Sequence, residues 1–460
     1  MCNAALLSLA ISLVPLFSFF NSKVQQIGPI ELSNPRVPWP LSVYNEYREA
    51  SEIPLTEESV IHAATNRTGL NYFGDEYQFP FRNGLRVLLS DATQDSKNMS
   101  AFGKAYLSDI ATQAVASRLQ MHDLLARHPE IMDEEIDRPV WIIGTPRSGS
   151  THLHRTLSQH KAFRAPKHFE LLEPVLTDSD RQDGKGKDAR WTRCKTRTDL
   201  LKHLRPKLSM MHWDDVDDAV EEPLAMMPMF RSPSFANAIP VRQYLAWYLY
   251  QSKTEEFQYL EMVLKVLQWQ DVQQGKPRRR WILRAQPHTP HLPFLWRVFP
   301  SAELVHLHRD PVAVTPAYLT LLAYSHGIFS KHIDLHDMGE WWVSFFDSFL
   351  HKAVGVREFN PDEKVLDVQF ADLVEDDLEV VKRVLEFAEE EANDADWQNM
   401  KNHIANNERY RDGHLEYDLS TFNLHESDLR LKFDFYREHF HVPKEAVKET
   451  LVSDGGHDEL

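Results

Sequence analysis

Cysteine and positive charge are both scarce in this chain of 460 residues. The only cysteines are Cys2 and Cys194. If Cys2 is removed or lies in a membrane, no internal disulfide can form, and a cysteine-based metal site is excluded. Lysine and arginine total 51 against 68 acidic residues, a formal charge of −17. This balance argues against a nucleic-acid partner, so any anion site must be built locally by a few arginines.

Long apolar runs are also absent, apart from one near the N-terminus. Residues 4–20 (AALLSLAISLVPLFSFF) are all apolar or small, and no lysine or arginine precedes them. The run is short for a spanning helix and close to the apolar core of a signal peptide. We therefore expect residues 1–27 to be a signal peptide or a signal anchor, with membrane association through this segment. The alternative is a buried or frayed N-terminal helix.

The opposite end of the chain has a second targeting feature. Residues 446–460 form an acidic tail that ends in HDEL, an endoplasmic-reticulum retrieval signal. A retrieval signal acts only in the lumen, and the N-terminal run offers a way in. The two ends together predict that the protein is located in the lumen of the endoplasmic reticulum or in a membrane facing that lumen. The alternative is a cytoplasmic location.

Helical patterns alternate with short apolar runs through the rest of the chain. Residues 28–54 are rich in proline and polar residues and predict an extended arm, whereas 57–129 have helical periodicity. Buried strands are predicted at residues 139–143, 281–284, 303–308 and 364–369. Helical stretches separate these strands, including one or two helices over 241–269. This alternation predicts an α/β fold with a parallel sheet covered on both faces.

No internal repeat and no clean linker interrupts this pattern, so we expect one elaborated domain. We place the N-terminal arm and helical region at 28–137 and the main α/β domain at 138–445.

The first chemical signal is GTPRSGST at residues 144–151, between a predicted strand and a predicted helix. Two glycines five apart, then a hydroxyl pair, is P-loop spacing, in which backbone N–H groups and a helix N-terminus bind an anion. The P-loop lysine position holds Ser150, which argues against an ordinary kinase or ATPase. The positive charge lies instead at Arg147, from where it could reach a bridging oxygen of a smaller anion.

The second signal is HLHRDP at residues 306–311. It places Arg309 at the carboxyl end of a strand, where α/β proteins bind ligands. Alone, an Arg309–Asp310 pair that closes a turn would explain it equally well. His306 and His308 lie two apart on a strand without further ligands, so we interpret them as structural and expect no metal site.

Together, residues 145–151 and 305–318 resemble the sulfotransferases that use 3′-phosphoadenosine 5′-phosphosulfate (PAPS), in particular the branch with a PRxGxT loop. The similarity runs in order from about residue 69 to 441, through 280–291 and 417–424. It implies a P-loop-like fold with helical N- and C-terminal additions. It also implies transfer of a sulfuryl group from PAPS to an acceptor hydroxyl or amine, with release of 3′-phosphoadenosine 5′-phosphate (PAP).

The resemblance further implies roles for individual residues. Arg147 takes the position of the family's catalytic lysine or arginine, and Arg309 that of its 3′-phosphate arginine. The residues expected to bind PAPS are Arg147, Ser148, Gly149, Ser150, Thr151, His152, Arg309 and Thr315. One departure is Ala317, where the family usually has a serine; Thr315 or Thr320 would then have to supply the hydroxyl.

Two residues are candidates for the base that takes the acceptor proton. His288 follows the strand at 281–284 and resembles the catalytic histidine of cytosolic family members, and its ordinary pKa suits neutral pH. Glu170 follows the P-loop helix, where related enzymes use a carboxylate. The sequence does not choose between them.

Several functional alternatives stay open at this point. The acceptor is a small molecule, a lipid or a glycan. A P-loop kinase for a small molecule and a non-catalytic protein that keeps the fold are the competing interpretations. Because a sulfuryl group has less negative charge than a phosphoryl group, an arginine can replace the magnesium that kinases need, and we expect no metal requirement.

Overall fold

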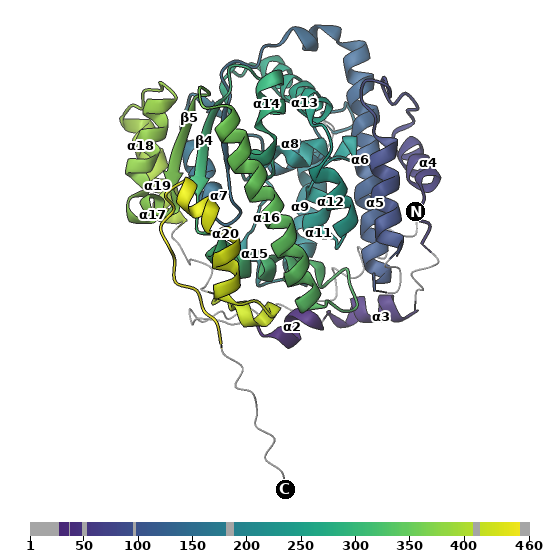
Figure 1. Ribbon diagram of the computed structural model, residues 1–460. Coiled ribbons are helices and arrows are strands. Elements are labelled where there is room, and N and C mark those ends of the chain that lie inside the picture. The colour runs from purple at the N-terminus through teal and green to yellow at the C-terminus, as the bar shows by residue number, and fades with distance from the viewer. Residues whose placement is uncertain are drawn as a thin grey trace.

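Five parallel strands form one sheet in the order β2-β3-β1-β4-β5. Strands β4 and β5 are labelled in Figure 1, next to α17 to α19. The bounds of the five strands in chain order are β1 (Val140–Gly144), β2 (Phe163–Arg164), β3 (Arg280–Arg284), β4 (Glu303–His308) and β5 (Val365–Gln369). The α/β fold with a parallel sheet is therefore confirmed, as are the predicted strands.

The coordinates are a computed structural model that describes residues 27–35, 37–47, 53–94, 98–180, 188–407 and 415–450. The predicted signal or anchor segment, apart from residue 27, and the C-terminal HDEL lie outside the described residues.

The central strands are apolar on both faces because helices cover both. In β1, Trp141 and Ile143 pack into the hydrophobic cluster around α13, while Val140 and Ile142 pack into the cluster around α7 and α18. This alternation is the two-residue period of a strand, and burial of all five β1 residues is typical of a doubly covered parallel sheet. The edge strand β2 was not predicted, since two residues give no periodic signal.

Helices cover both faces of the sheet. The N-terminal helices are α2 (Pro29–Ser33), α3 (Trp39–Tyr47), α4 (Glu57–Thr68), α5 (Arg82–Gln94) and α6 (Ala101–Arg127). The next α-helices are α7 (Ser150–Leu157), α8 (His168–Leu172), α9 (Ala189–Leu204), α10 (Leu208–Met211), α11 (Ser234–Ala238), α12 (Arg242–Leu249), α13 (Thr254–Gln273) and α14 (Leu292–Val298). The last are α15 (Pro311–His326), α16 (Leu335–Phe359), α17 (Phe370–Glu375), α18 (Asp377–Phe387), α19 (Asp394–Asn406) and α20 (Glu426–His439). Four 3-10 helices are also described: η2 (Pro129–Asp133), η4 (Glu222–Met229), η5 (Gln286–His291) and η6 (Leu419–Phe422).

In Figure 1, α17 to α19 lie on one side of the sheet and α4 to α6 at the opposite side of the molecule. The prediction of helices over 57–129 is confirmed, and of the one or two helices predicted over 241–269 the structure has two, α12 and α13. The prediction of an extended arm over 28–54 is wrong in part, because α2 and α3 form there. Both helices bury a leucine against the body of the protein, Leu32 near α15 and α16 and Leu41 near α6.

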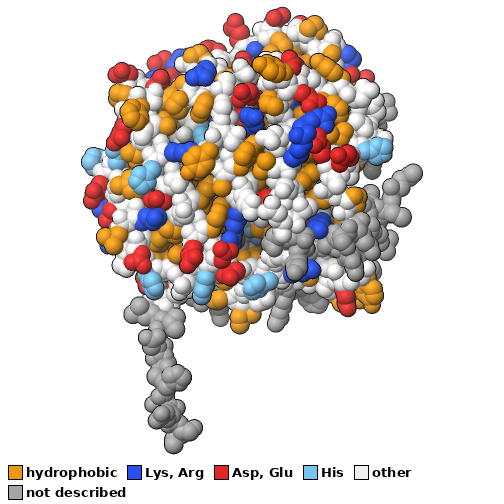
Figure 2. Space-filling view, turned by 45° about the vertical axis from the view of Figure 1, so that its right-hand side comes forward, with side chains coloured by type: hydrophobic (Ala, Val, Ile, Leu, Met, Phe, Trp, Pro, Cys, Tyr) orange, Lys and Arg blue, Asp and Glu red, His pale blue; other side chains and the backbone are white. Residues whose placement is uncertain are grey.

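Charge on the protein surface is mixed. On the face shown in Figure 2, acidic and basic side chains are interspersed among apolar ones. That face therefore offers no broad basic area for a polyanion, and an anion site must depend on local geometry.

Candidate active site

The loop between β1 and α7 is shaped by two glycines in conformations that other residues rarely adopt. Gly144 has φ 138°, and a Cβ there would lie 2.1 Å from the Leu307 carbonyl oxygen of β4. Gly149 has φ 84°, and a Cβ there would lie 2.5 Å from Leu373. Since only glycine fits both places, the loop can lie close against β4 and turn directly into α7.

The start of α7 is arranged to bind an anion. Gly149 is its N-cap and makes no side-chain cap, and the first N–H groups of any helix have no partner within the helix. The N–H groups of Ser150, Thr151 and His152 therefore face outward at the positive end of the helix dipole. The Ser148 hydroxyl is buried and bonds to the Thr145 carbonyl oxygen (2.7 Å), so this side chain holds the loop's shape.

Arg147 stands in the middle of this loop, in the left-handed region at φ 62°. Its Nη1 donates to the Met211 carbonyl oxygen (2.5 Å) and its Nη2 to the Tyr417 hydroxyl (3.3 Å). Its Nε is buried with no hydrogen-bond partner among the described residues. The guanidinium is thus held from two sides and keeps one donor for a further oxygen.

Arg309 follows the last residue of β4 and reaches the same loop. Its Nη1 donates to the Arg147 carbonyl oxygen (2.7 Å), and its guanidinium lies 4.1 Å from the centre of the Phe370 ring. The structure therefore brings together the two arginines that the sequence singled out. The remaining nitrogens of Arg309 bond to Glu445.

A cavity of about 1450 Å³ opens over both arginines. Pockets for a single ligand usually measure about 300–1,000 Å³, so this one has room for a donor and an acceptor together. The predicted donor residues that line it are Arg147, Gly149, Ser150, Thr151, His152 and Arg309.

The cavity has a polar part and an apolar part. The apolar part is lined from α15 and α16 by Tyr318, Leu321, Leu322, Trp342, Phe345, Phe346 and Phe349. Ala317 lines the cavity as well, whereas Thr315 and Thr320 do not. Their hydroxyls bond to carbonyl oxygens of α15, those of Pro311 and Pro316. The assignment of Thr315, or of Thr320, as the replacement for the serine hydroxyl therefore stays a prediction that this geometry does not favour.

Neither predicted base lines the cavity. Both carboxylate oxygens of Glu170 accept from the Arg164 guanidinium (2.8 Å each), and one also accepts from the Lys167 N–H (2.8 Å). The His288 Nε2 lies 3.1 Å from Glu222, with both side chains almost fully buried. These partners fit structural roles, so the assignment of either residue as the base stays a prediction that the geometry does not favour.

The sequence interpretation missed Glu221 and Arg284, which do line the cavity. Gln286 connects Glu221 to the donor loop: in the orientation that satisfies all its partners, its amide donates to Glu221 Oε2 (2.9 Å) and accepts from Ser150. Arg284 Nη1 lies 3.9 Å from Glu221, and its Nε and Nη2 are buried without a described partner. Glu221 lies in a stretch rich in acidic residues (Asp214 to Glu222), which alone is typical of a solvated loop. Only its position in the fold, on the cavity wall, distinguishes it from its neighbours.

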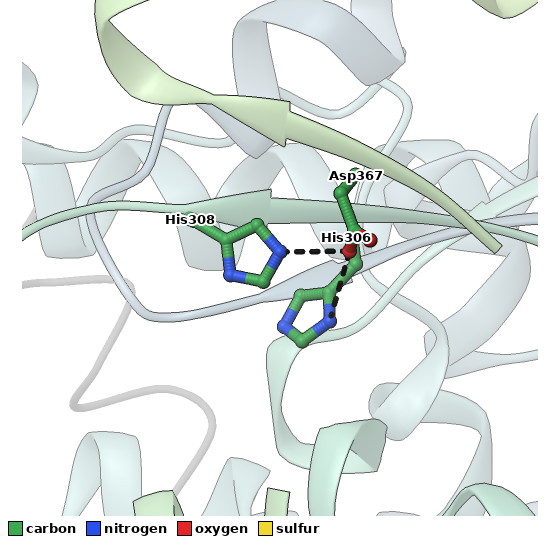
Figure 3. A group of neighbouring side chains, drawn as sticks. All are labelled: His306, His308 and Asp367. Carbon is green, nitrogen blue, oxygen red and sulfur yellow. Dashed lines mark hydrogen bonds and ion pairs between the residues drawn. The ribbon is translucent and has the colours of Figure 1, made fainter. Parts of the chain in front are cut away.

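A second cluster, drawn in Figure 3, joins two histidines of β4 to an aspartate of β5. The ligand atoms of His306, His308 and Asp367 all lie within 4.8 Å of one another. However, Arg357 donates to both oxygens of Asp367 (2.7 and 3.0 Å) and lies 3.1 Å from His306 Nδ1. Burial lowers the pKa of both histidines, which keeps them neutral. Because Arg357 already supplies the positive charge here, we interpret the cluster as a hydrogen-bonded support for the end of β4.

Comparison with known proteins agrees with the fold. A sequence model described as the sulfotransferase family matches residues 139–394. The omega-hydroxy-beta-dihydromenaquinone-9 sulfotransferase Stf3 of Mycobacterium bovis and Mycobacterium tuberculosis is 26% identical over 258 residues. That match covers 52% of this chain and 60% of the relative.

Two solved structures superpose on most of the chain. Sulfotransferase STF9 from Mycobacterium avium is 24% identical, with a TM-score of 0.73 over 85% of this chain and 98% of that one. Sulfotransferase STF1 from M. tuberculosis H37Rv is 20% identical, with a TM-score of 0.70 over 84% and 99%. At these identities the two structures establish a shared fold.

The predicted location in the endoplasmic reticulum is wrong. The two curated relatives and the two superposed structures are mycobacterial proteins, and mycobacteria have no such compartment. Among the helices that the structure describes, none combines the length and the apolar character that a bilayer crossing requires.

Proposed function

The chain belongs to the sulfotransferase family, and from this premise we propose that it transfers the sulfuryl group of PAPS to a hydroxyl group on an apolar acceptor. The observation that supports this best is the meeting of two anion-binding elements at one cavity. The first element is the N-terminus of α7 together with Arg147. The second is Arg309, which donates to the Arg147 carbonyl oxygen (2.7 Å) and lines the same cavity.

The donor has two phosphate groups, and we assign one to each element. The N–H groups of residues 150–152 would bind the 5′-phosphate. The Arg309 guanidinium would bind the 3′-phosphate, because a guanidinium can donate two parallel hydrogen bonds to two phosphate oxygens. The resemblance implies the same division. The leaving oxygen between phosphorus and sulfur would then lie near the Nε of Arg147, which has no hydrogen-bond partner in the described part of the chain.

The transfer step needs positive charge near the leaving oxygen and correct positioning of the donor and the acceptor. The acceptor oxygen attacks sulfur, the bond from sulfur to the bridging oxygen breaks, and PAP leaves with that electron pair. Arg147 neutralises the negative charge that grows on the bridging oxygen. Arg284, whose Nε and Nη2 have no described partner, is placed to hold a sulfuryl oxygen during the step.

We propose Glu221 as the base that takes the acceptor proton. It is a carboxylate on the cavity wall, and one amide, Gln286, separates it from Ser150 at the start of α7. A base must lie within hydrogen-bond reach of the proton it removes, a condition that Glu170 and His288 do not meet in this cavity. His212, which also lines the cavity and bonds to Asp214 (3.1 Å), is the second candidate.

The apolar part of the cavity indicates the chemical class of the acceptor. Aromatic and aliphatic side chains of α15 and α16 line it, and such a wall favours a hydrophobic body over a glycan. The mycobacterial relatives are named for an omega-hydroxy menaquinone acceptor. We therefore propose that the acceptor is an amphipathic molecule whose hydroxyl points toward Arg147 and Glu221.

The donor assignment predicts that PAP binds without magnesium and raises the melting temperature. Isothermal titration calorimetry with PAP, with and without magnesium, measures this directly. Arg309→Ala should weaken PAP binding by about tenfold or more through loss of a charge-assisted contact. Tighter binding of ATP with magnesium than of PAP would instead support the P-loop kinase interpretation.

The acceptor assignment predicts that Phe345→Ala raises the acceptor KM by about tenfold or more, because it removes apolar contact area. The probe is a set of long-chain primary alcohols assayed with labelled PAPS. Phe359→Ala is the matched control, since Phe359 lies on the same helix with 86% of its surface exposed. Equal KM values for the two variants, or sulfation of soluble glycans alone, would contradict an apolar acceptor.

A further inference from the structure

The arginine assigned to the donor's 3′-phosphate already holds an anion from its own chain. Arg309 Nε donates to Glu445 Oε1 (2.9 Å) and its Nη2 to Oε2 (2.8 Å). The two side chains are only 16% and 30% exposed. A carboxylate bound through two oxygens matches the way in which a phosphate binds a guanidinium.

The backbone of Glu445 is held in place beside Arg309. Its N–H donates to Asp310 Oδ2 (2.8 Å), and its carbonyl oxygen accepts from Arg430 Nη2 (2.9 Å). Arg430 also donates to Asp310 (2.6 Å), which is buried at the N-cap of α15. With its main chain fixed in this way, Glu445 can leave Arg309 only by a movement of its side chain.

The same segment of chain faces the cavity. Ala446 and Lys448, on either side of residue 447, both line it. The Glu445 carboxylate therefore lies at the edge of the space in which we place the donor.

We propose that Glu445 is an internal competitor of the donor: its carboxylate takes the place of the 3′-phosphate on Arg309 in the free protein and is displaced when PAPS or PAP binds. This inference rests on the proposed function. Because Arg309 cannot pair fully with two anions, the carboxylate reduces the fraction of protein that is ready to bind, and so weakens apparent affinity. The displaced carboxylate also stays near the bound phosphate and repels it, which favours release of PAP.

Calorimetry with PAP tests the proposal on three proteins: the unchanged chain, Glu445→Gln and Glu449→Gln. Loss of the charge at Glu445 should tighten PAP binding by about three- to tenfold, the range expected for a partly exposed ion pair with two hydrogen bonds. Glu449→Gln is the matched control, because Glu449 lies in the same segment and bonds to His425 (2.8 Å) and the Glu426 N–H (2.9 Å). Its PAP affinity should not change.

Two further measurements make the test specific. Adenosine 5′-phosphate, which lacks the 3′-phosphate, should gain little affinity from Glu445→Gln. In an Arg309→Ala background, Glu445→Gln should have no effect on PAP binding. Unchanged or weaker PAP binding by Glu445→Gln, or an equal gain for adenosine 5′-phosphate, would overturn the proposal while leaving the donor assignment intact. Failure of the unchanged chain to bind PAP would overturn the proposed function itself.

Discussion

Replacing Arg147 with alanine is expected to lower kcat by about a hundredfold or more, with a smaller effect on PAP affinity. The loss falls on kcat because negative charge builds on the bridging oxygen only as the bond to sulfur breaks. In the ground state the N–H groups at the start of α7 share the binding of the 5′-phosphate, so the donor stays bound. Arg147→Lys should recover part of the rate, since it keeps the charge but loses the planar geometry.

The measurement is turnover of labelled PAPS at saturating donor, together with calorimetry on PAP. Arg383→Ala is a suitable control, because Arg383 pairs with Asp372 (2.9 Å) and does not line the cavity. A kcat close to that of the unchanged chain would remove Arg147 from the chemical step. A large loss of PAP affinity with little change in kcat would make it a binding residue only.

Glu221→Gln is expected to lower kcat by about a hundredfold or more, the usual contribution of a well-placed general base. The amide keeps the shape and the contact with Gln286 but cannot accept the proton. The donor affinity should change little, since Glu221 does not contact either of the proposed phosphate positions.

The variants Glu170→Gln and His288→Ala, compared with Glu221→Gln, decide whether the base is one of the two residues predicted from the sequence or the residue proposed from the structure. Glu170 pairs with buried Arg164, and His288 lies against buried Glu222, so each change should lower the melting temperature more than kcat. If either variant folds and loses nearly all turnover while Glu221→Gln does not, the base is that residue. If all three keep their rates, His212→Ala is the next variant to test.

The loop that we assign to the donor was predictable because its signal is local. The GTPRSGST motif places two required glycines, an arginine and a helix start within eight neighbouring residues, and a strand, loop and helix in that order bind anions wherever they occur. The strands β1, β3 and β4 were predictable for a similar reason: burial on both faces needs a continuous apolar run. By contrast, β2 is two residues long and forms only through its pairing with β3.

The proposed acceptor part of the cavity and the proposed base depend on contacts between distant parts of the chain. Glu170 and Glu221 are both glutamates, and nothing in the side chain itself predicts which of the two faces the cavity. Arg164 occupies the first in the fold, whereas the second faces the cavity. Likewise, Arg309 and Glu445 lie 136 positions apart, and no periodicity predicts that they meet.

The sequence alone thus determined the fold class and the donor loop, because both depend on residues that are neighbours in the chain. Only the tertiary structure decided which acidic side chain faces the cavity, which aromatic side chains line it, and which anion holds Arg309. The physical reason is that a carboxylate has the same intrinsic chemistry everywhere. Its role is decided by the partners that folding brings within hydrogen-bond distance.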